Sequence, residues 1–344
     1  MRRLRSGWLK VAAPIAFLHA AGWLTLLAAV MPEHLGIGAR ALGAGTGLTA
    51  YLLGVRHAFD ADHIAAIDNS IRKLLRDGQP SRSVGLWFAM GHSSVVLALT
   101  LLVSQGARQL SSLLTDGSSP LHDLAGLAGS LISIGFLYLI ASVNLFSLGG
   151  LWGAIRHAKS GGNALSGRDA QRPAGPMAWI LRPAMSLVGK PWHMGVVGFL
   201  FGLGFDTASE VTLLVLAGTG VATGLPAYAI LCLPLLFGAG MTLCDTLNSL
   251  LMVSAYGWAG GGPVRRLWYD FALTALSAAI GLAVGTFELA GLVGERIPGT
   301  PWQGLASMDL TDVGIGVAAL FLVVWSAATL IRSRSAQRAS TTAP

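Results

Sequence analysis

The sequence predicts an all-α membrane protein with eight transmembrane helices and both termini in the cytoplasm. Hydrophobic residues make up 53% of its 344 residues, only 11% are charged, and the mean hydropathy is +0.63. Soluble domains carry about 25% charged residues. The apolar residues form eight segments of about the length that a helix needs to cross a bilayer. They span residues 11–31, 43–71, 84–104, 124–149, 193–218, 226–256, 268–292 and 310–331.

The first segment follows a basic N-terminus, as the hydrophobic region of a signal peptide does. Its apolar stretch of about 20 residues exceeds the 7–15 residues of a signal sequence. We therefore interpret it as an uncleaved first membrane helix.

Lysine and arginine residues predict the orientation of the helices. If eight segments cross the bilayer, 19 of the 23 basic side chains fall on one side and only Arg40, Arg108 and Arg296 on the other. Loops rich in Lys and Arg stay in the cytoplasm. The pattern therefore places both termini in the cytoplasm and predicts a multi-pass protein of the cytoplasmic membrane that is surrounded by the lipid bilayer.

The sequence predicts two four-helix halves joined by a linker. Residues 1–149 and 193–331 form the halves, residues 150–192 a cytoplasmic linker rich in Gly, Pro and Arg, and residues 332–344 a cytoplasmic tail. A faint internal echo relates Asp60–His63 and Phe88–His92, in the second and third segments, to Asp206–Glu210 and Phe237–Met241, in the fifth and sixth. Such an echo fits an inverted repeat with its site near the middle of the membrane.

Several function classes fit poorly. The net charge of +7 is spread over short loops without a basic face interleaved with aromatic residues, so we expect no nucleic-acid partner. Cys232 and Cys244 form no Cys-x-x-Cys pair, and we expect both to be buried as small apolar residues. No phosphate-binding loop is present, so nothing implies ATP hydrolysis or an ATPase subunit. We expect no prosthetic group.

Residues 56–69 are the most informative stretch because six ionisable side chains lie inside an apolar segment. They are Arg56, His57, Asp60, Asp62, His63 and Asp68. Ionisable groups are costly within a membrane and usually mark the path of an ion or substrate. Imidazole and carboxylate together suit a divalent transition metal. A structural polar network between helices is the alternative, but six ionisable groups exceed what packing requires.

An ideal helix would bring some of these groups together. At about 100° per residue, His57, Asp60 and His63 share one face, and Asp62 lies roughly 140° from His57, outside that face. Arg56 and Asp60 are four residues apart, so we expect them to form a structural ion pair. Asp62 would need a distortion of the helix to join the others.

Other segments add candidate metal ligands. His92 lies near the middle of the third segment, Asp206 and Glu210 share a face of the fifth, and Asp245 lies in the sixth. His19 in the first segment could reach the same cavity or simply bond to a neighbouring helix. Several acids and three histidines at similar depth predict transport of a cation.

The candidate ligands favour Ni²⁺, Co²⁺ or Zn²⁺. Two isolated cysteines and the lack of a Met-rich motif argue against Cu(I), and the histidines argue against Mg²⁺. A membrane-embedded metalloenzyme is a poor alternative because His-Glu-x-x-His is absent. A metal exporter is the closer one.

Four motifs in this order carry a family resemblance. They are Arg56-His-Ala-Phe-Asp-Ala-Asp-His-Ile64, Gly91-His-Ser-Ser-Val-Val96, Leu203-Gly-Phe-Asp-Thr-Ala-Ser-Glu210 and Gly240-Met-Thr-Leu-Cys-Asp-Thr246. Over nearly its whole length the chain resembles the nickel/cobalt permease family. The resemblance implies eight helices, cytoplasmic termini, high-affinity uptake of Ni²⁺ or Co²⁺ as transported substrate, and a central role for His57, Asp62 and His63.

The chain departs from the family pattern at one place. Members commonly continue the fourth motif as Asp-Thr-x-Asp-Gly, whereas this chain has Asn248 and Ser249. Loss of that acid could alter coupling or metal preference. Phe59 and His19 resemble the residues of members that take both metals.

Overall fold

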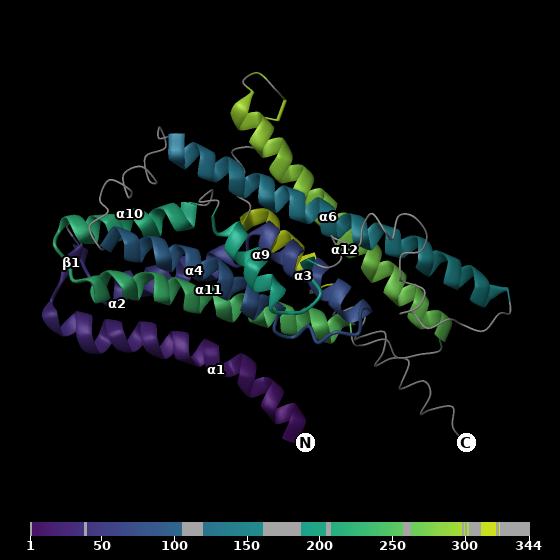
Figure 1. Cartoon of the computed structure of the whole chain (residues 1–344), viewed down its shortest axis with the longest axis horizontal. Coiled ribbons are helices and arrows are strands. Elements are labelled where there is room, and N and C mark those ends of the chain that lie inside the picture. The colour runs from purple at the N-terminus through teal and green to yellow at the C-terminus, as the bar shows by residue number, and fades with distance from the viewer. Residues whose placement is uncertain are drawn as a thin grey trace.

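The computed structural model describes residues 2–37, 40–104, 120–160, 187–203, 208–256, 263–297, 299, 301–302, 311–320 and 323. These residues are mostly helical (Figure 1). The longer helices are α1 (Arg2–Leu24), α2 (Ala44–His57), α3 (Ala61–Arg76), α4 (Val84–Ser104), α6 (Pro120–Lys159), α9 (His193–Phe201), α10 (Ala208–Ala222), α11 (Ala227–Tyr256) and α12 (Pro263–Arg296). Residues 311–320 form a further helical stretch.

Five stretches of helix in the described part of the chain are long and apolar enough to cross a membrane. They are Val11–Glu33, Val84–Leu102, Gly126–Lys159, Ala227–Ser254 and Leu267–Arg296. Thr212–Ala222 and Thr311–Leu320 are apolar but shorter. The prediction of an all-α, multi-spanning membrane protein is thereby confirmed, whereas the count of eight spans stays a prediction.

Two predicted segments differ in form from a single helix. Segment 43–71 consists of α2 and α3, with a break between them. Segment 193–218 consists of α9 and α10, and residues 204–207 between them lie outside the described residues. Elsewhere α4 and α11 lie close to their predicted bounds, and α6 continues to Lys159, ten residues into the predicted linker.

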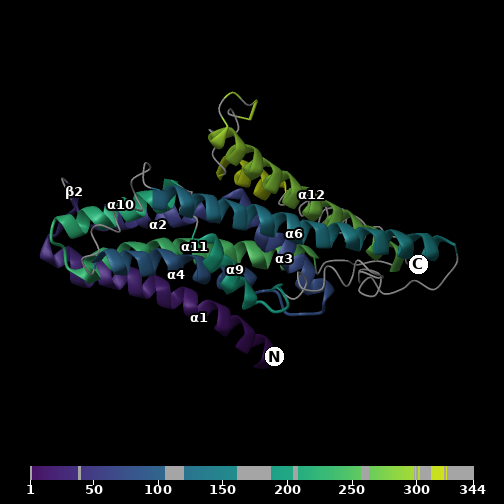
Figure 2. The ribbon, with the colours of Figure 1, turned by 45° about the horizontal axis from the view of Figure 1, so that its top comes forward.

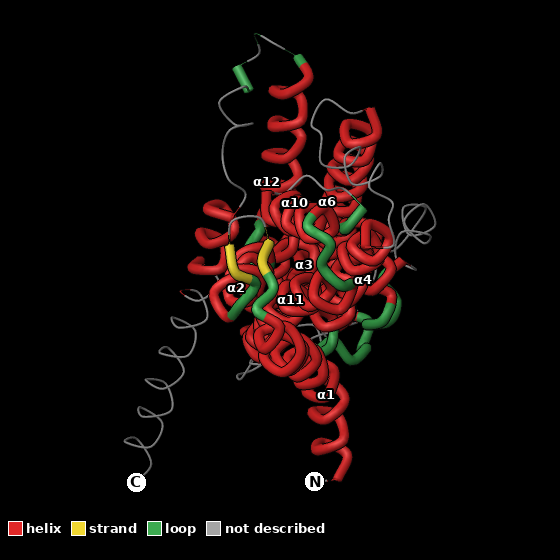
Figure 3. Tube along the Cα trace, turned by 90° about the vertical axis from the view of Figure 1, so that its left-hand side faces the viewer, coloured by secondary structure: helices red, strands yellow, loops and turns green. Residues whose placement is uncertain are grey.

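The helices pack in three layers. Helix α1 lies along one side against α11, and α2, α4, α9, α10 and α11 form the centre (Figure 1). On the other side α6 and α12 pack along each other, with α3 against both (Figure 2). After α1, a π-helical turn (Thr25–Val30) and a 3-10 turn (Met31–Glu33) lead into a small hairpin, β1 (Gly36–Ile37) with β2 (Arg40–Ala41), at one end of the bundle (Figure 3).

Glycines bring two pairs of central helices into backbone contact in the same way, and each pair joins one half of the chain to the other. A methyl group on Gly54 of α2 would overlap the carbonyl oxygen of Phe237 on α11, and one on Gly198 of α9 would overlap that of Phe88 on α4. Small residues permit such close approach between membrane helices. The two phenylalanines are the ones that open the echoed motifs, so the internal echo corresponds to a shared packing pattern.

Two apolar clusters meet at the centre of the bundle. One gathers around α3 and includes Phe88 and Phe201, and the other gathers around α11 and includes Leu236 and Phe237. Phe88 and Phe237 are fully buried. The polar residues described next lie between these two phenylalanines.

Candidate metal centre

The helix break between α2 and α3 positions the first candidate ligands. Backbone hydrogen bonds from Phe59 N–H to Arg56 O (2.9 Å) and from Asp60 N–H to His57 O (3.0 Å) form a turn. Asp60 has extended backbone angles at the N-cap of α3, a position that Asp favours. The expectation of one ideal helix through residues 56–63 is therefore wrong. His57 ends one helix, and His63 lies in the first turn of the next.

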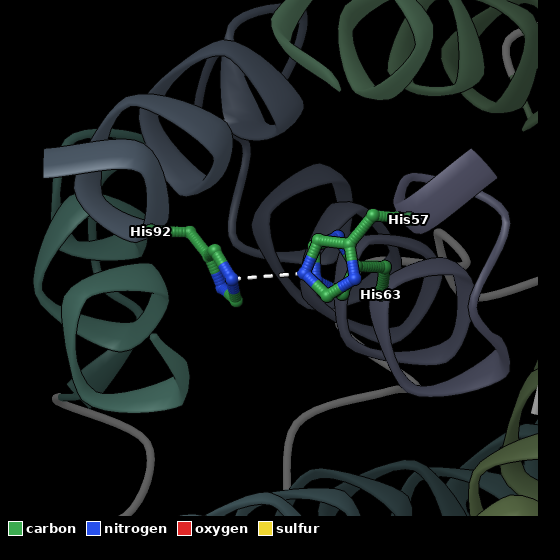
Figure 4. Close-up of side chains that lie close together, drawn as sticks. All are labelled: His57, His63 and His92. Atoms are coloured by element: carbon green, nitrogen blue, oxygen red, sulfur yellow. Dashed lines mark hydrogen bonds between the residues drawn. The ribbon is translucent and has the colours of Figure 1, made fainter. Parts of the chain in front are cut away.

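Three imidazole rings converge beside this break. His57 from α2, His63 from α3 and His92 from α4 each offer a ring nitrogen, and these nitrogens lie within 4.8 Å of one another (Figure 4). The ring centroids are 4.6–4.9 Å apart. All three residues are buried, with at most 3% of their surface exposed.

Two carboxylates face the Nδ1 atoms of this cluster. Asp60 Oδ2 lies 2.9 Å from His57 Nδ1, and Asp245 Oδ2 lies 3.4 Å from His63 Nδ1. A carboxylate at one ring nitrogen orients the ring and leaves the other nitrogen available to bind a metal. His63 Nε2 has no hydrogen-bond partner among the described residues. Asp60 and Asp245 are thus placed where they can orient His57 and His63.

Glu210 instead faces the Nε2 atoms. Its Oε1 lies 2.6 Å from His92 Nε2 and 3.8 Å from His57 Nε2, and the two Nε2 atoms are 2.9 Å apart. A cation bound about 2.0–2.1 Å from each nitrogen, as imidazole binds zinc, would hold two such nitrogens about 2.9–3.4 Å apart. The spacing of the two Nε2 atoms therefore fits a first-row transition-metal ion shared by His57 and His92, with His63 and Glu210 beside them.

Aromatic side chains close two sides of the cluster. Phe88 packs edge to face against His63 with ring centroids 4.8 Å apart, and Phe237 packs against His57 at 5.6 Å. Electrostatic interactions are stronger in such water-poor surroundings than in bulk water. Sequence reasoning did not assign these phenylalanines to the site, although both open the echoed motifs.

The remaining predicted residues do not all join the cluster. Asp62 is half-buried in the first turn of α3, where its Oδ1 accepts a hydrogen bond from the backbone N–H of His63 at 2.8 Å. His19 has its ring nitrogens near Ile15 O (2.9 Å) and Tyr51 Oη (3.3 Å). Asp206 lies outside the described residues.

Arg56 is exposed in the last turn of α2. The helix break places Arg56 and Asp60 on either side of a turn, and their predicted ion pair stays a prediction. Asp60 contacts His57 and also accepts a hydrogen bond from Thr311 Oγ1 at 2.6 Å. Sequence reasoning missed Thr311 because a single threonine at the start of an apolar segment carries no signal.

Comparison with known families adds a match over residues 43–331 to the family described as "High-affinity nickel-transport protein". The chain belongs to this nickel-transport family. The match covers most of the helices described above, including all four that supply His57, His63, His92 and Glu210.

Individual relatives within the nickel-transport family are similar over most of their length. The chain is 46% identical over 322 residues to nickel transporter NicT of Mycobacterium tuberculosis, covering 93% of this chain and 87% of the relative. It is 39% identical over 302 residues to cobalt transport protein NhlF of Rhodococcus rhodochrous (86% and 84% covered) and 36% identical over 327 residues to nickel-transport protein NixA of Helicobacter pylori (92% and 94% covered). No solved structure matches the chain.

The departure from the family's fourth motif has a place in the packing. Ser249 is fully buried, and its Oγ accepts a hydrogen bond from the backbone N–H of Gly85 at 2.7 Å. A methyl group on Gly85 would overlap the carbonyl oxygen of Asp245. Ser249 therefore fastens α11 to α4 one turn from the carboxylate that faces His63.

Proposed function

We propose that this chain is a secondary transporter that takes up Ni²⁺, Co²⁺ or both across the cytoplasmic membrane. The observation that carries the proposal is the buried cluster of His57, His63 and His92 at the break between α2 and α3. Relatives are named as nickel and cobalt transporters, which supports both ions as substrates. Phe59 and His19 resemble residues of members that take both metals. We regard the chain as a permease rather than an enzyme.

In this proposal the ion exchanges its water for side chains of the cluster. The three histidines and Glu210 hold the ion, and Asp60 and Asp245 orient His57 and His63. Asp62, which the family pattern includes, and Asp206 supply further negative charge along the path. The membrane potential provides about 2.3 kcal/mol per charge per 100 mV, or roughly 4.6 kcal/mol for a divalent cation. That suffices for uptake without ATP, with or without a coupled proton.

The proposed topology has eight spans and cytoplasmic termini. The excess of Lys and Arg on one side supports it. In this arrangement α2 and α3 together make one span, as do α9 and α10. Discontinuous helices of this kind form the binding sites of many secondary transporters.

Uptake of radiolabelled Ni²⁺ and Co²⁺ into cells at trace concentration tests the proposal. The wild-type chain is compared with the His57→Ala/His63→Ala double variant and with His157→Ala, which changes an exposed histidine of α6. We expect accumulation by wild type and His157→Ala and loss of accumulation in the double variant, and competition between the ions ranks them. Metal resistance in place of accumulation would identify an exporter and contradict the proposal.

A further inference from the structure

The helical stretch Thr311–Leu320 reaches the break between α2 and α3. A methyl group on Gly314 would overlap the carbonyl oxygen of Phe59, so the backbones of the two segments touch. Val313 and Val317 pack against the apolar cluster around α3. Thr311 is buried, with 8% of its surface exposed. A segment about 250 residues after His57 in the chain therefore packs at the edge of the metal centre.

Thr311 completes a chain of polar contacts that leads to the metal centre. Its hydroxyl donates a hydrogen bond to Asp60 Oδ1 at 2.6 Å. The second oxygen of the same carboxylate, Oδ2, lies 2.9 Å from His57 Nδ1. His57 then points its Nε2 atom at His92 and Glu210. Asp60 therefore has one oxygen on each neighbour and cannot rotate without giving up one of them.

The contact with Asp60 favours one tautomer of the neutral His57 imidazole. A neutral imidazole carries its proton on one nitrogen and accepts at the other. A carboxylate held against Nδ1 favours the proton there and leaves the Nε2 lone pair for a metal. Because Asp60 is 4% exposed, water cannot easily replace the threonine hydroxyl at Oδ1.

We propose that Thr311 is a positioning residue of the metal centre, which holds Asp60 so that His57 presents a bare Nε2 to the transported ion. The proposal rests on the proposed function for its effect on metal affinity. Thr311 lies in the last apolar segment, which contains none of the four family motifs and none of the clustered histidines.

Three variants separate the hydroxyl from the space it fills. Thr311→Val keeps the shape and removes the donor, whereas Thr311→Ser keeps the donor. Thr100→Val on α4 is the matched control, because Thr100 is fully buried and its hydroxyl has no hydrogen-bond partner among the described residues. Each full-length protein is purified in detergent, and Ni²⁺ binding is measured by calorimetry beside uptake in cells.

We expect Thr311→Val to bind Ni²⁺ about 3–10-fold more weakly, below the 10–100-fold typical of groups that touch a ligand directly. Thr311→Ser and Thr100→Val should bind like wild type. Equal binding by Thr311→Val and wild type would overturn the proposal. Equal weakening in Thr311→Val and Thr311→Ser, or in Thr311→Val and Thr100→Val, would attribute the effect to packing and overturn it as well.

A second measurement does not depend on transport. Nitrogen NMR of histidine-labelled, metal-free protein reports which ring nitrogen carries the proton, and the His57→Asn variant assigns the signal. We expect the Nδ1–H form in wild type and Thr311→Ser and a mixture of both forms in Thr311→Val. If wild type neither binds nor accumulates Ni²⁺, the proposed function fails. An unchanged His57 signal in Thr311→Val would overturn the positioning role of Thr311, whatever the outcome of the Ni²⁺ measurements.

Discussion

At the residue scale, the carboxylates around the histidines divide into two kinds by the nitrogen that each one faces. Asp60 and Asp245 face Nδ1 atoms, and Glu210 faces the two Nε2 atoms that are 2.9 Å apart. A carboxylate at Nδ1 acts through its histidine, whereas one at Nε2 can touch the ion itself. Substitutions of the two kinds should therefore differ in effect.

Glu210→Gln should weaken Ni²⁺ binding by at least about tenfold. The change keeps the size of the side chain but removes the charge from the oxygen that faces the two Nε2 atoms, and amides are poorer ligands for a divalent cation than carboxylates. Calorimetry on purified protein measures the loss. Glu295→Gln, at the exposed end of α12, is the matched control. Binding by Glu210→Gln at the wild-type level would remove Glu210 from the ligand set.

His92→Ala should lower uptake at limiting metal by roughly tenfold or more. The substitution removes a buried nitrogen that lies within reach of both His57 and Glu210, and loss of a ligand should cost at least as much as loss of an orienting group, which is typically 10–100-fold. Initial rates of radiolabelled Ni²⁺ uptake, with His157→Ala as control, measure the effect. Indistinguishable rates in His92→Ala and wild type would show that His92 is not a ligand.

Much of this site could be predicted from the sequence, because charges in apolar segments are visible without a structure. His57, His63, His92, Glu210 and Asp245 were all singled out that way. Distances between helices are not visible, so which ring nitrogen each carboxylate faces could not be predicted. The contact of Thr311 with Asp60 was hidden for the same reason.

At the element scale, the break between α2 and α3 decides which groups meet. Hydropathy averages over about 20 residues, so the three-residue interruption between α2 and α3 leaves an apolar segment looking continuous. The bounds of α4 and α11 were well predicted because no break interrupts them. The difficulty of fitting Asp62 to an ideal helix was the one sign in the sequence that residues 56–63 are not a single helix.

Because α2 packs closely on α11, a larger side chain at Gly54 should lower the stability of the protein. Gly54→Ala should destabilise the protein by about 1–3 kcal/mol, the usual cost of overpacking, because its methyl group would overlap the backbone of Phe237. Gly198→Ala should act similarly through Phe88. Thermal unfolding in detergent measures the change.

Gly149→Ala is the control for both substitutions. A methyl group there meets no atom within 4 Å, and alanine favours a helix over glycine by about 1 kcal/mol. It should therefore be neutral or stabilising. A Gly54→Ala protein as stable as Gly149→Ala would contradict the close contact between α2 and α11.

At the scale of the whole molecule, charge distribution and helix packing suggest the same arrangement. The basic loops predict that the second and third segments run opposite to the fifth and sixth. The glycine contacts pair α2 with α11 and α9 with α4, so each half's broken helix packs on the other half's unbroken one. The sequence could predict the opposite orientation of these two pairs of segments, but their exchange of partners required the structure.

Labelling from outside the cell should follow the proposed topology. Thr223→Cys, in the exposed turn between α10 and α11, should react with a membrane-impermeant thiol reagent in intact cells. Ser160→Cys, just after α6, should react only after the cells are permeabilised. The parent protein gives the background, because Cys232 is buried and Cys244 half-buried. Labelling of Ser160→Cys in intact cells would rule out the eight-span arrangement.

The backbone contacts at Gly54 and Gly198 also restrict how the protein can move. Side-chain contacts can loosen by changing rotamer, but two backbones in contact can only stay together or separate as wholes. Gly85 on α4 touches the backbone of Asp245 on α11 in the same way, so α2, α11, α4 and α9 should move as one rigid unit. Because His57 and His92 both belong to this unit, passage of an ion should move other helices around the two histidines and leave the distance between their nitrogens unchanged.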